Sequence, residues 1–463
     1  MVFSSLVFLW VFLPIIFIGY FLIQDKYKNM LLLLGSLIFY AWGEPIYIWL
    51  MLCSIFVNYG IGLLMDRYQH KRMLLVLDIA INIGMLGYFK YFNFWVEIVN
   101  SCTGKEMELK EITLPIGISF FTFQILSYII DLYRGHYRAQ KNFIHLALYI
   151  SFFPQLIAGP IVQYKDINKQ LNCRVCTPEK TAWGIRKFIY GLGKKVIIAN
   201  ITAQCVDIIY ALDYINLTGL LAWIGAILYT LQIYYDFSGY SDMAIGLGRI
   251  LGFDFQENFN YPYLSCSIQE FWRRWHISLG TWFREYLYIP LGGNRKGKTK
   301  TYLNLFCVFF ATGLWHGASF NFILWGLYHG FFQIIERLGL KGVLSKHKIG
   351  AYIYTMMILV FGWVLFRADN LIQAGVIVKR MFMPWKYTES SLLTGKVFGN
   401  KTIVIIFAGI LGCGPIQVFL QKTKISGKVK NSYLEMIYCS IIFILCIAML
   451  ASNTYNPFIY FRF

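Results

Sequence analysis

Apolar stretches long enough to cross a lipid bilayer recur from one end of this 463-residue chain to the other. A helix needs roughly 20 apolar residues to span the hydrocarbon core. Hydrophobic residues make up 58% of the chain and charged residues 14%, which is too little charge to cover a soluble protein of this length. We therefore predict an all-α, multi-pass integral membrane protein. We expect roughly 11 or more transmembrane helices, with re-entrant and interfacial helices around a central passage.

The basic residues predict the orientation of these spans. The formal net charge is +19, and much of it lies in short turns such as Lys26–Lys28, Arg67–Arg72 and Arg134–Lys141. Cytoplasmic turns carry such an excess of Lys and Arg, so we place these three turns in the cytoplasm and the N-terminus outside. The first apolar stretch, Phe3–Ile23, has no basic residue before it and no small-residue cleavage site, which predicts a retained span. Because the basic residues do not gather on one face, no nucleic-acid partner is expected.

The middle of the chain departs from a simple series of spans. Ala158-Gly159-Pro160 interrupts an apolar region, where proline would kink or end a helix, so a re-entrant segment is expected there. The stretch from Trp183 to Lys195 is basic and amphipathic, which suits a helix lying in the cytoplasmic interface. Two apolar segments follow, Leu220–Tyr235 and Ser241–Leu251. No internal repeat is visible, and we treat 1–463 as a single domain.

Ten cysteines are scattered along the chain and indicate no disulfide framework. Cys173 and Cys176 form one C-x-x-C pair, but no second pair or histidine lies near it. We interpret them as ordinary loop thiols and predict no metal site.

Ionisable residues inside apolar segments are the candidates for chemistry, because burying them in a membrane is costly. His316 follows an apolar run and is flanked by glycines in Thr312–Ala318, so it is either a hydrogen-bonded structural histidine or a base that activates a hydroxyl. His276 closes a stretch with two arginines between tryptophans, which suits an interfacial helix or cation–π packing. We interpret His329 as structural. Asp236 and Asp242 are expected to pair with Arg or His, or to line a polar passage.

The sequence also limits the reaction classes. It contains no G-x-S-x-G nucleophile elbow, H-E-x-x-H motif or dinucleotide-binding fingerprint. A different feature points to an anionic substrate. One short, glycine-bearing turn holds four basic residues: Arg295, Lys296, Lys298 and Lys300. This turn is either one more cytoplasmic topology signal or a site that attracts the phosphates of an acyl donor.

Two long motifs resemble the membrane-bound O-acyltransferase family, and within it the bacterial branch that acetylates alginate and related polysaccharides. They are EFWRRWHISLGTWFREYLYIPLGGNRKG (Glu270–Gly297) and GLWHGASFNFILWGLYHG (Gly313–Gly330). Shorter stretches extend the resemblance over nearly the whole chain: PQLIAGPI (Pro154–Ile161), YYDFSGYSDMAIG (Tyr234–Gly246), FGWVLFRA (Phe361–Ala368), NPFIYFRF (Asn456–Phe463) and the opening MVFSSLVFLW.

The resemblance implies a function and roles for two histidines. The W-H-G histidine of the family is catalytic and falls on His316, and the family's second functional position falls on His276. The expected reaction moves an acetyl group from a cytoplasmic thioester, acetyl-CoA or an acylated carrier, to an extracytoplasmic polysaccharide. His316 would be the general base, and His276 would orient the acyl group or stabilise charge on the thioester oxygen. No bound cofactor is expected.

The resemblance also implies partners and leaves alternatives. Family members commonly work with a separate extracytoplasmic, esterase-like protein of the SGNH type, so we expect such a partner here. The chain itself is expected in the bacterial cytoplasmic membrane. A related family member serves teichoic acid D-alanylation, and the Gly292–Arg295 element favours acetyl over D-alanyl transfer. A non-catalytic transporter or flippase for a lipid-linked glycan is the alternative from another class. Missing repeats and the W-H-G context count against it.

Overall fold

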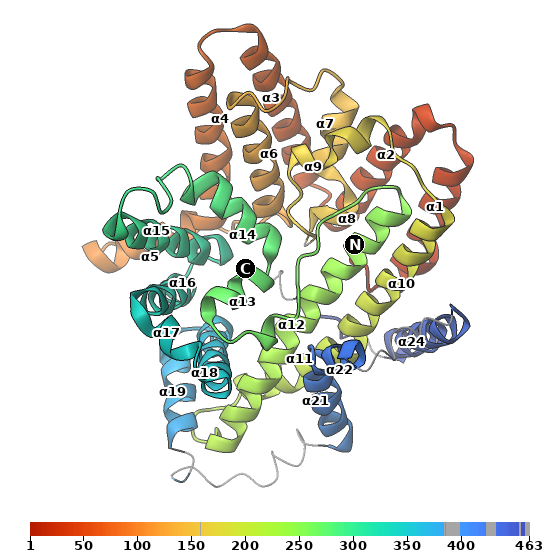
Figure 1. The fold of residues 1–463 in the computed structure, drawn as a ribbon. Coiled ribbons are helices and arrows are strands. Elements are labelled where there is room, and N and C mark those ends of the chain that lie inside the picture. Colours follow the sequence, from red (N-terminus) through yellow and green to blue (C-terminus); the bar gives the residue numbers. More distant parts are fainter. Residues whose placement is uncertain (158, 384, 386–398, 423–431, 453–454, 459–463) are drawn as a thin grey trace. The chain divides into compact units, whose positions relative to one another are not determined.

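The computed structural model describes residues 1–157, 159–383, 385, 399–422, 432–452 and 455–458. All regular elements within these ranges are helical (Figure 1). By internal contacts the chain forms two compact units, of which unit 1 comprises 1–188 and 241–256 and unit 2 comprises 189–240 and 257–463. Two of the three boundaries fall within helices, and the third, between residues 256 and 257, falls in a loop. The single-domain assignment stays a prediction.

Unit 1 contains the first nine α-helices and the start of the tenth. Their bounds are α1 Leu13–Leu22, α2 Asp25–Gly43, α3 Tyr47–Arg67, α4 Lys71–Leu86, α5 Phe92–Thr103, α6 Ile118–Tyr133, α7 Phe143–Ser151, α8 Phe153–Leu156, α9 Tyr164–Asn172 and α10 Pro178–Gly193. Single π-helical turns precede α1 and join α4 to α5. The core of this unit lies where α6 and α7 pack against α2, α3 and α4.

Unit 2 contains the end of α10 and nearly all of the helices that follow it. The helices are α11 Asn200–Tyr210, α12 Gly219–Ile250, α13 Ile268–Arg274, α14 Ile277–Phe283, α15 Lys298–His316, α16 Phe320–Ile335, α17 Lys341–Leu344, α18 Lys348–Arg367, α19 Leu371–Phe382, α21 Asn400–Gly412, α22 Pro415–Lys422 and α24 Ser432–Ser452. The last turns of α12 belong to unit 1. Buried aromatic side chains of α12, α13, α16 and α18 form the core of unit 2.

The helices agree with a membrane protein. Five described helices are long and apolar enough to cross a bilayer: Tyr47–Arg67, Lys71–Thr103, Gly219–Ile250, Lys348–Arg367 and Tyr433–Ser452. Three shorter apolar helices cover Phe8–Leu22, Ile118–Tyr133 and Thr402–Gly412. The predicted number of eleven or more spans is not confirmed by these helices. The predicted orientation also stays a prediction.

The predicted break in the middle of the chain is confirmed. Helix α7 ends at Ser151, the four-residue α8 follows, and α9 begins only at Tyr164. The described residues between α8 and α9 are buried, so their backbone groups need partners inside the protein. The Tyr149 hydroxyl provides one by donating a 3.0 Å hydrogen bond to the Val162 carbonyl. Whether the segment is re-entrant in a membrane stays a prediction.

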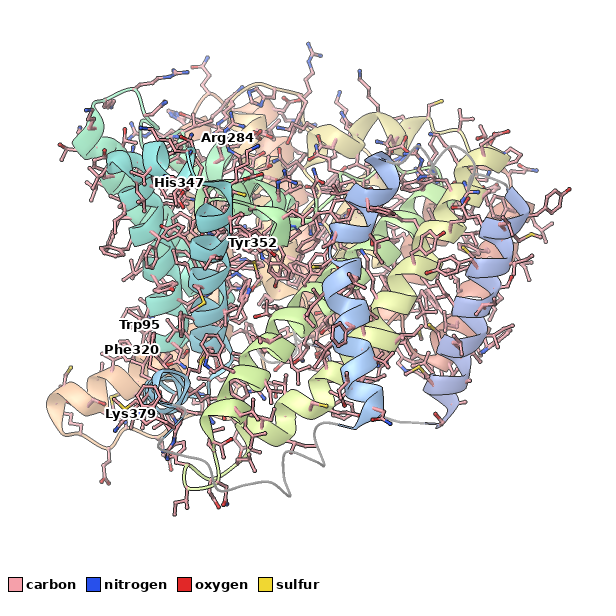
Figure 2. All side chains as sticks on the ribbon, turned by 60° about the horizontal axis from the view of Figure 1, so that its bottom comes forward. Trp95, Arg284, Phe320, His347, Tyr352 and Lys379 are labelled. Carbon is pink, nitrogen blue, oxygen red and sulfur yellow. The ribbon has the colours of Figure 1, made fainter. Side chains whose placement is uncertain are left out.

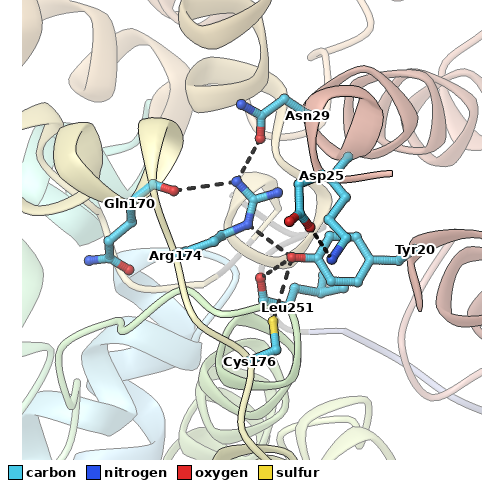
Figure 3. A network of polar contacts seen from close by, with 8 residues as sticks. Tyr20, Asp25, Asn29, Gln170, Arg174, Cys176 and Leu251 are labelled. Carbon is cyan, nitrogen blue, oxygen red and sulfur yellow. Dashed lines mark hydrogen bonds and ion pairs between the residues drawn. The ribbon is translucent and has the colours of Figure 1, made fainter. Parts of the chain in front are cut away.

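The C-x-x-C pair belongs to a hydrogen-bonded loop of unit 1 (Figure 3). Arg174, between the two cysteines, donates from Nε to the Tyr20 hydroxyl at 2.9 Å and from Nη1 to Asn29 Oδ1 at 2.6 Å. Cys176 Sγ lies 3.6 Å from the same Tyr20 hydroxyl. Both Cys173 and Cys176 are free thiols, as expected for ordinary loop cysteines. Arg174 thereby ties the loop after α9 to α1 and α2.

Helix α12 corrects the prediction of two separate apolar segments. It runs unbroken through Asp236 and Asp242 for 32 residues, because each carboxylate has a lysine partner. Lys195 Nζ lies 2.6 Å from Asp236 Oδ1 within unit 2, and Lys187 Nζ lies 3.0 Å from Asp242 Oδ1 within unit 1. The expected pairing of these aspartates is confirmed, with lysine in place of Arg or His.

The same pairs correct the predicted interfacial helix. Lys195 is 2% exposed, so it belongs to the protein interior and not to a basic face in the headgroup layer. Its ammonium also donates to the Pro457 carbonyl. A Cβ built on Gly239 would lie 2.7 Å from the Gly191 carbonyl oxygen. This close approach lets the short Lys195–Asp236 bridge form.

Residues 402–419 form one largely apolar stretch in the sequence, but in the structure they are divided between α21 and α22 at Cys413 and Gly414. Gly414 has a φ of 151°, which favours glycine, and Pro415 begins the next helix.

We expect Lys195→Met to destabilise the protein by about 3–5 kcal/mol, because it leaves the Asp236 carboxylate buried without its counter-ion. Thermal unfolding of the purified protein in detergent measures this effect. Adding Asp236→Asn should recover most of the loss. Lys187→Met, at a more exposed pair, is the matched control and should cost less. A loss of equal size in the double variant would contradict the assignment.

Candidate active site

The segment that carries His276 is fixed by capping interactions at the start of α13. Ser267 accepts a hydrogen bond from the Glu270 backbone N–H at 3.0 Å, as the Ncap residue of a capping box does. Glu336, which follows α16, accepts from the backbone N–H groups of Ile268 and Gln269 at 2.6 and 3.0 Å. A carboxylate at a helix N-terminus also matches the positive end of the helix dipole. Helix α13 is thereby held to the end of α16.

The tryptophans around the two arginines face the interior. Trp275 is 3% exposed and packs on Trp363, with ring centroids 4.9 Å apart. Arg274 pairs with Glu270 at 2.9 Å. The interpretation as an interfacial helix is therefore wrong for Trp275, because α18 offers its ring an aromatic partner that the local sequence does not show.

His276 lies in the bend between α13 and α14 and is 1% exposed. Its φ of 45° is unusual for a residue with a side chain. Asn258 Oδ1 lies 3.2 Å from His276 Nδ1 and also accepts from the backbone N–H and the hydroxyl of Ser278, at 3.1 and 2.9 Å. The backbone donor identifies this Asn258 atom as oxygen, so Nδ1 carries the proton.

The charge and tautomer of His276 follow from these contacts. Burial lowers the pKa of the imidazole to about 3, so the ring is neutral at physiological pH. A neutral ring with its proton on Nδ1 presents a lone pair at Nε2. The His276 ring also packs edge-on against the ring of Phe237, with centroids 4.5 Å apart. Phe237 directly follows Asp236, the carboxylate that pairs with Lys195.

His316 is the last residue of α15 and lies against α16, its neighbour in unit 2 (Figure 1). The two helix backbones touch, because a Cβ built on Gly326 would lie 2.2 Å from the Phe309 carbonyl oxygen and one on Gly313 would lie 2.4 Å from that of Phe322. His316 is 7% exposed. Its ring lies 4.9 Å from Trp325 and 5.2 Å from Phe366 between centroids.

Trp315 connects the two candidate histidines. Its ring centroid is 6.0 Å from that of His276 and 5.0 Å from that of His316. The imidazole centroids can be no farther apart than the sum of these distances, 11.0 Å. The fold therefore brings together two histidines that are separated by 40 positions in the chain.

His329 is fully buried and also packs on Trp325. Its ring is 5.2 Å from Trp325 and 5.2 Å from Trp272 between centroids. Neither ring nitrogen has a hydrogen-bond partner among the described residues. The surroundings are those of a packed aromatic core, in keeping with a structural role.

The four basic residues lie at the opposite end of α15 from His316. Arg295, Lys296, Lys298 and Lys300 are all exposed. Gly297, with a φ of 87°, precedes the first residue of the helix, and no acidic residue occupies its first turn. At 1.5 Å per residue, the 19 residues of α15 place this turn about 27 Å from His316. The fold does not bring the basic residues beside the histidines. Figure 2 labels Phe320, the first residue of α16, in the lower part of the view and Arg284, which follows α14, in the upper part.

Comparison with known proteins identifies the family. The sequence profile of the membrane-bound O-acyltransferase family matches residues 36–363, a range that includes both His276 and His316. The chain belongs to this family.

Three relatives with known names show which enzymes of the family the chain is similar to. A probable alginate O-acetylase of Pseudomonas putida is 42% identical over the full length of both chains. A peptidoglycan O-acetyltransferase of Helicobacter pylori is 39% identical over 82% of this chain and 80% of its own. A teichoic acid D-alanyltransferase of Bacillus subtilis is 32% identical over 46% of this chain and 56% of its own. The protein is thus a membrane O-acyltransferase.

Sequence reasoning missed two residues that hold the site. Asn258 lies in a polar loop with no motif around it, and only the fold shows its bond to His276. Glu336 follows α16 and caps α13, which no local pattern indicates. The Ser267–Glu270 spacing is a capping-box signal and could have predicted where α13 begins.

We expect Asn258→Ala to lower kcat by about tenfold or more with little change in KM, because it releases the His276 ring from its tautomer and orientation. Acyl transfer by the purified protein measures this. Ser278→Ala is the matched control, since it removes the hydroxyl that donates to Asn258 Oδ1 and lies 3.5 Å from His276 Nδ1, but leaves the bond between Asn258 and the imidazole in place. Equal activity of Asn258→Ala and wild type would show that Asn258 does not position the ring.

Proposed function

We propose that this enzyme transfers an acetyl group from a cytoplasmic thioester across the membrane, for O-acetylation of an extracytoplasmic polysaccharide. The observation that carries the proposal is the position of His316. It ends a helix whose other end presents four basic residues, and it lies within 11.0 Å of a second buried histidine. A base and a donor-binding end on one helix suit transfer between the two sides of a membrane.

His316 acts as the general base in this mechanism. Its imidazole takes the proton of the acceptor hydroxyl, whose oxygen attacks the thioester carbonyl carbon. The carbon–sulfur bond then breaks, and the imidazolium returns the proton to the departing thiolate. The C-terminal end of α15 favours the transient positive charge, because the partial negative end of the helix dipole lies there. A well-placed base contributes typically 10² to 10⁴ in rate.

His276 orients a reactant in this mechanism. Two roles are expected for His276: orienting the acyl group, or stabilising charge on the thioester oxygen. The tautomer of the ring favours the first role. A neutral imidazole protonated at Nδ1 has no proton at Nε2 to give to a developing oxyanion. The Nε2 lone pair instead accepts a hydrogen bond, from the acceptor hydroxyl or from an amide of the donor.

The basic turn before α15 receives the phosphates of the donor, acetyl-CoA or an acylated carrier. The N-terminal end of α15 carries the positive end of the helix dipole, and Lys298 and Lys300 add positive charge there. These charges repel each other unless an anion binds. This arrangement supports a function beyond that of a topology signal. No bound cofactor is needed.

The relatives support a class of acceptor. The names of the similar proteins give alginate, peptidoglycan and teichoic acid as acceptors, so we assign a cell-surface polysaccharide here. An extracytoplasmic, esterase-like protein of the SGNH type completes the transfer, receiving the acetyl group on a serine. The protein then resides in the bacterial cytoplasmic membrane.

D-alanyl transfer to teichoic acid is the second candidate, and the likeness to the Bacillus subtilis enzyme favours it. That likeness covers under half of this chain, whereas the likeness to the alginate O-acetylase covers all of it. Acetyl transfer is therefore preferred. Membership of an acyltransferase family counts against a non-catalytic transporter.

We expect His316→Ala to abolish acetyl transfer while the unfolding temperature stays near that of the wild type. Labelled acetyl-CoA, the esterase-like partner and a polysaccharide acceptor provide the assay. The matched control is His347→Ala, which removes an exposed histidine before α18 and should keep full activity. Retention of a tenth or more of wild-type turnover by His316→Ala would exclude it as the base.

Neutralising Arg295, Lys296, Lys298 and Lys300 together with Gln should raise the donor KM several-fold, more at low salt, with little change in kcat. Basic groups attract phosphate at long range, and salt screens the effect over about 8 Å at physiological strength. Lys346→Gln/Lys348→Gln changes another exposed basic turn of unit 2 and serves as the control. An unchanged donor KM at low ionic strength would leave only the topological role.

A further inference from the structure

Aromatic rings surround the proposed base. The His316 centroid lies 5.0 Å from Trp315, 4.9 Å from Trp325 and 5.2 Å from Phe366, and each pair is close to edge-on. The rings come from three different helices, α15, α16 and α18. His316 deprotonates a hydroxyl group, and the oxygen of that group attacks the acyl carbon. The acyl carbon must therefore lie about one hydroxyl group away from the imidazole. The acyl group therefore meets this aromatic wall.

The rings of this wall also pack against one another and against the next layer. Trp325 lies 4.8 Å from Phe366 and 5.9 Å from Trp363, and Trp363 lies 5.7 Å from Phe366. None of these three side chains is more than 3% exposed. At such centroid distances aromatic rings are in van der Waals contact. A methylene chain cannot pass between them unless a ring moves.

The helix backbones hold the wall in place. Trp325 precedes Gly326, where α16 touches the backbone of α15, so α16 cannot move away from His316 without breaking that contact. Phe366 lies near the end of α18, where the side chain of Asn321 in α16 donates 2.8 Å to the Ala368 carbonyl. These two anchors keep Trp325 and Phe366 beside the imidazole.

We propose that Trp325 and Phe366 limit the length of the acyl group, so that the enzyme accepts a two- or three-carbon acyl thioester and rejects chains of four or more carbons. The inference rests on the proposed function, because it takes His316 as the reacting base. It adds the substrate class and the two residues that determine it. Extra methylenes forced into a packed aromatic site lower the rate by roughly tenfold or more.

Purified full-length protein in lipid tests the proposal with acetyl, butyryl and hexanoyl groups, each offered both on CoA and on phosphopantetheine. The measured quantity is the ratio of kcat/KM for butyryl to that for acetyl transfer. We expect a wild-type ratio of about 0.1 or less. Trp325→Leu and Phe366→Leu should each raise the ratio about tenfold, even where their acetyl activity falls.

Phe361→Leu is the matched control. Phe361 lies on α18, five positions before Phe366, and its ring stacks on Phe382 with centroids 5.3 Å apart. It is not one of the rings that pack on His316 among the described residues. Its ratio should equal that of the wild type. Since a ratio is compared within one preparation, a partly unfolded variant still gives a valid result. Trp325→Phe keeps a smaller ring and should give an intermediate ratio.

The outcomes separate this proposal from the proposed function. Equal use of butyryl and acetyl groups by the wild type, or an unchanged ratio in both leucine variants, would overturn the length limit while acetyl transfer stands. A preference for D-alanyl over acetyl groups with the same exclusion of butyryl would support the length limit and overturn acetyl as the substrate. Failure to transfer any acyl group would overturn both.

Discussion

Direct backbone contact between α15 and α16 holds the candidate site together. At Gly313 and Gly326 there is no room for a side chain, and the two helices approach until the carbonyl groups of one meet the Cα atoms of the other. This approach brings His316, the last residue of α15, against Trp325 of α16. Small residues allow such approaches between helices in membranes, where packing replaces the hydrophobic effect as the driving force. The surrounding rings and the second histidine depend on it.

A second constraint comes from charge inside an apolar protein. Asp236 would interrupt α12 if it stood alone, because an unpaired carboxylate is costly to bury. Lys195 neutralises it, and α12 continues past Phe237, whose ring packs on His276. His276 itself stays neutral and is oriented by Asn258. The site is thus prepared by groups that take no part in the chemistry: an ion pair on one side and an amide on the other.

Much of the architecture could be predicted from the sequence, because apolar periodicity and glycine or proline breaks are local signals. The hairpin of α2 and α3, the break after α7 and the ends of α15 follow from them. His276 and His316 stood out because ionisable residues are rare in apolar segments. Lys195 was misjudged, since its sequence neighbours are basic and its partner Asp236 lies 41 residues away. Asn258 and Glu336 act on segments distant in the chain, so no local pattern shows them.

The central claim is that the enzyme moves an acetyl group from one side of the membrane to the other. Proteoliposomes provide the most direct test, with labelled acetyl-CoA outside and both a polysaccharide acceptor and the esterase-like partner sealed inside. The account predicts labelled acetyl esters on the enclosed polysaccharide from those proteins whose basic turn before α15 faces the outside. Ester formation only when acceptor and thioester share one side of the membrane would contradict it.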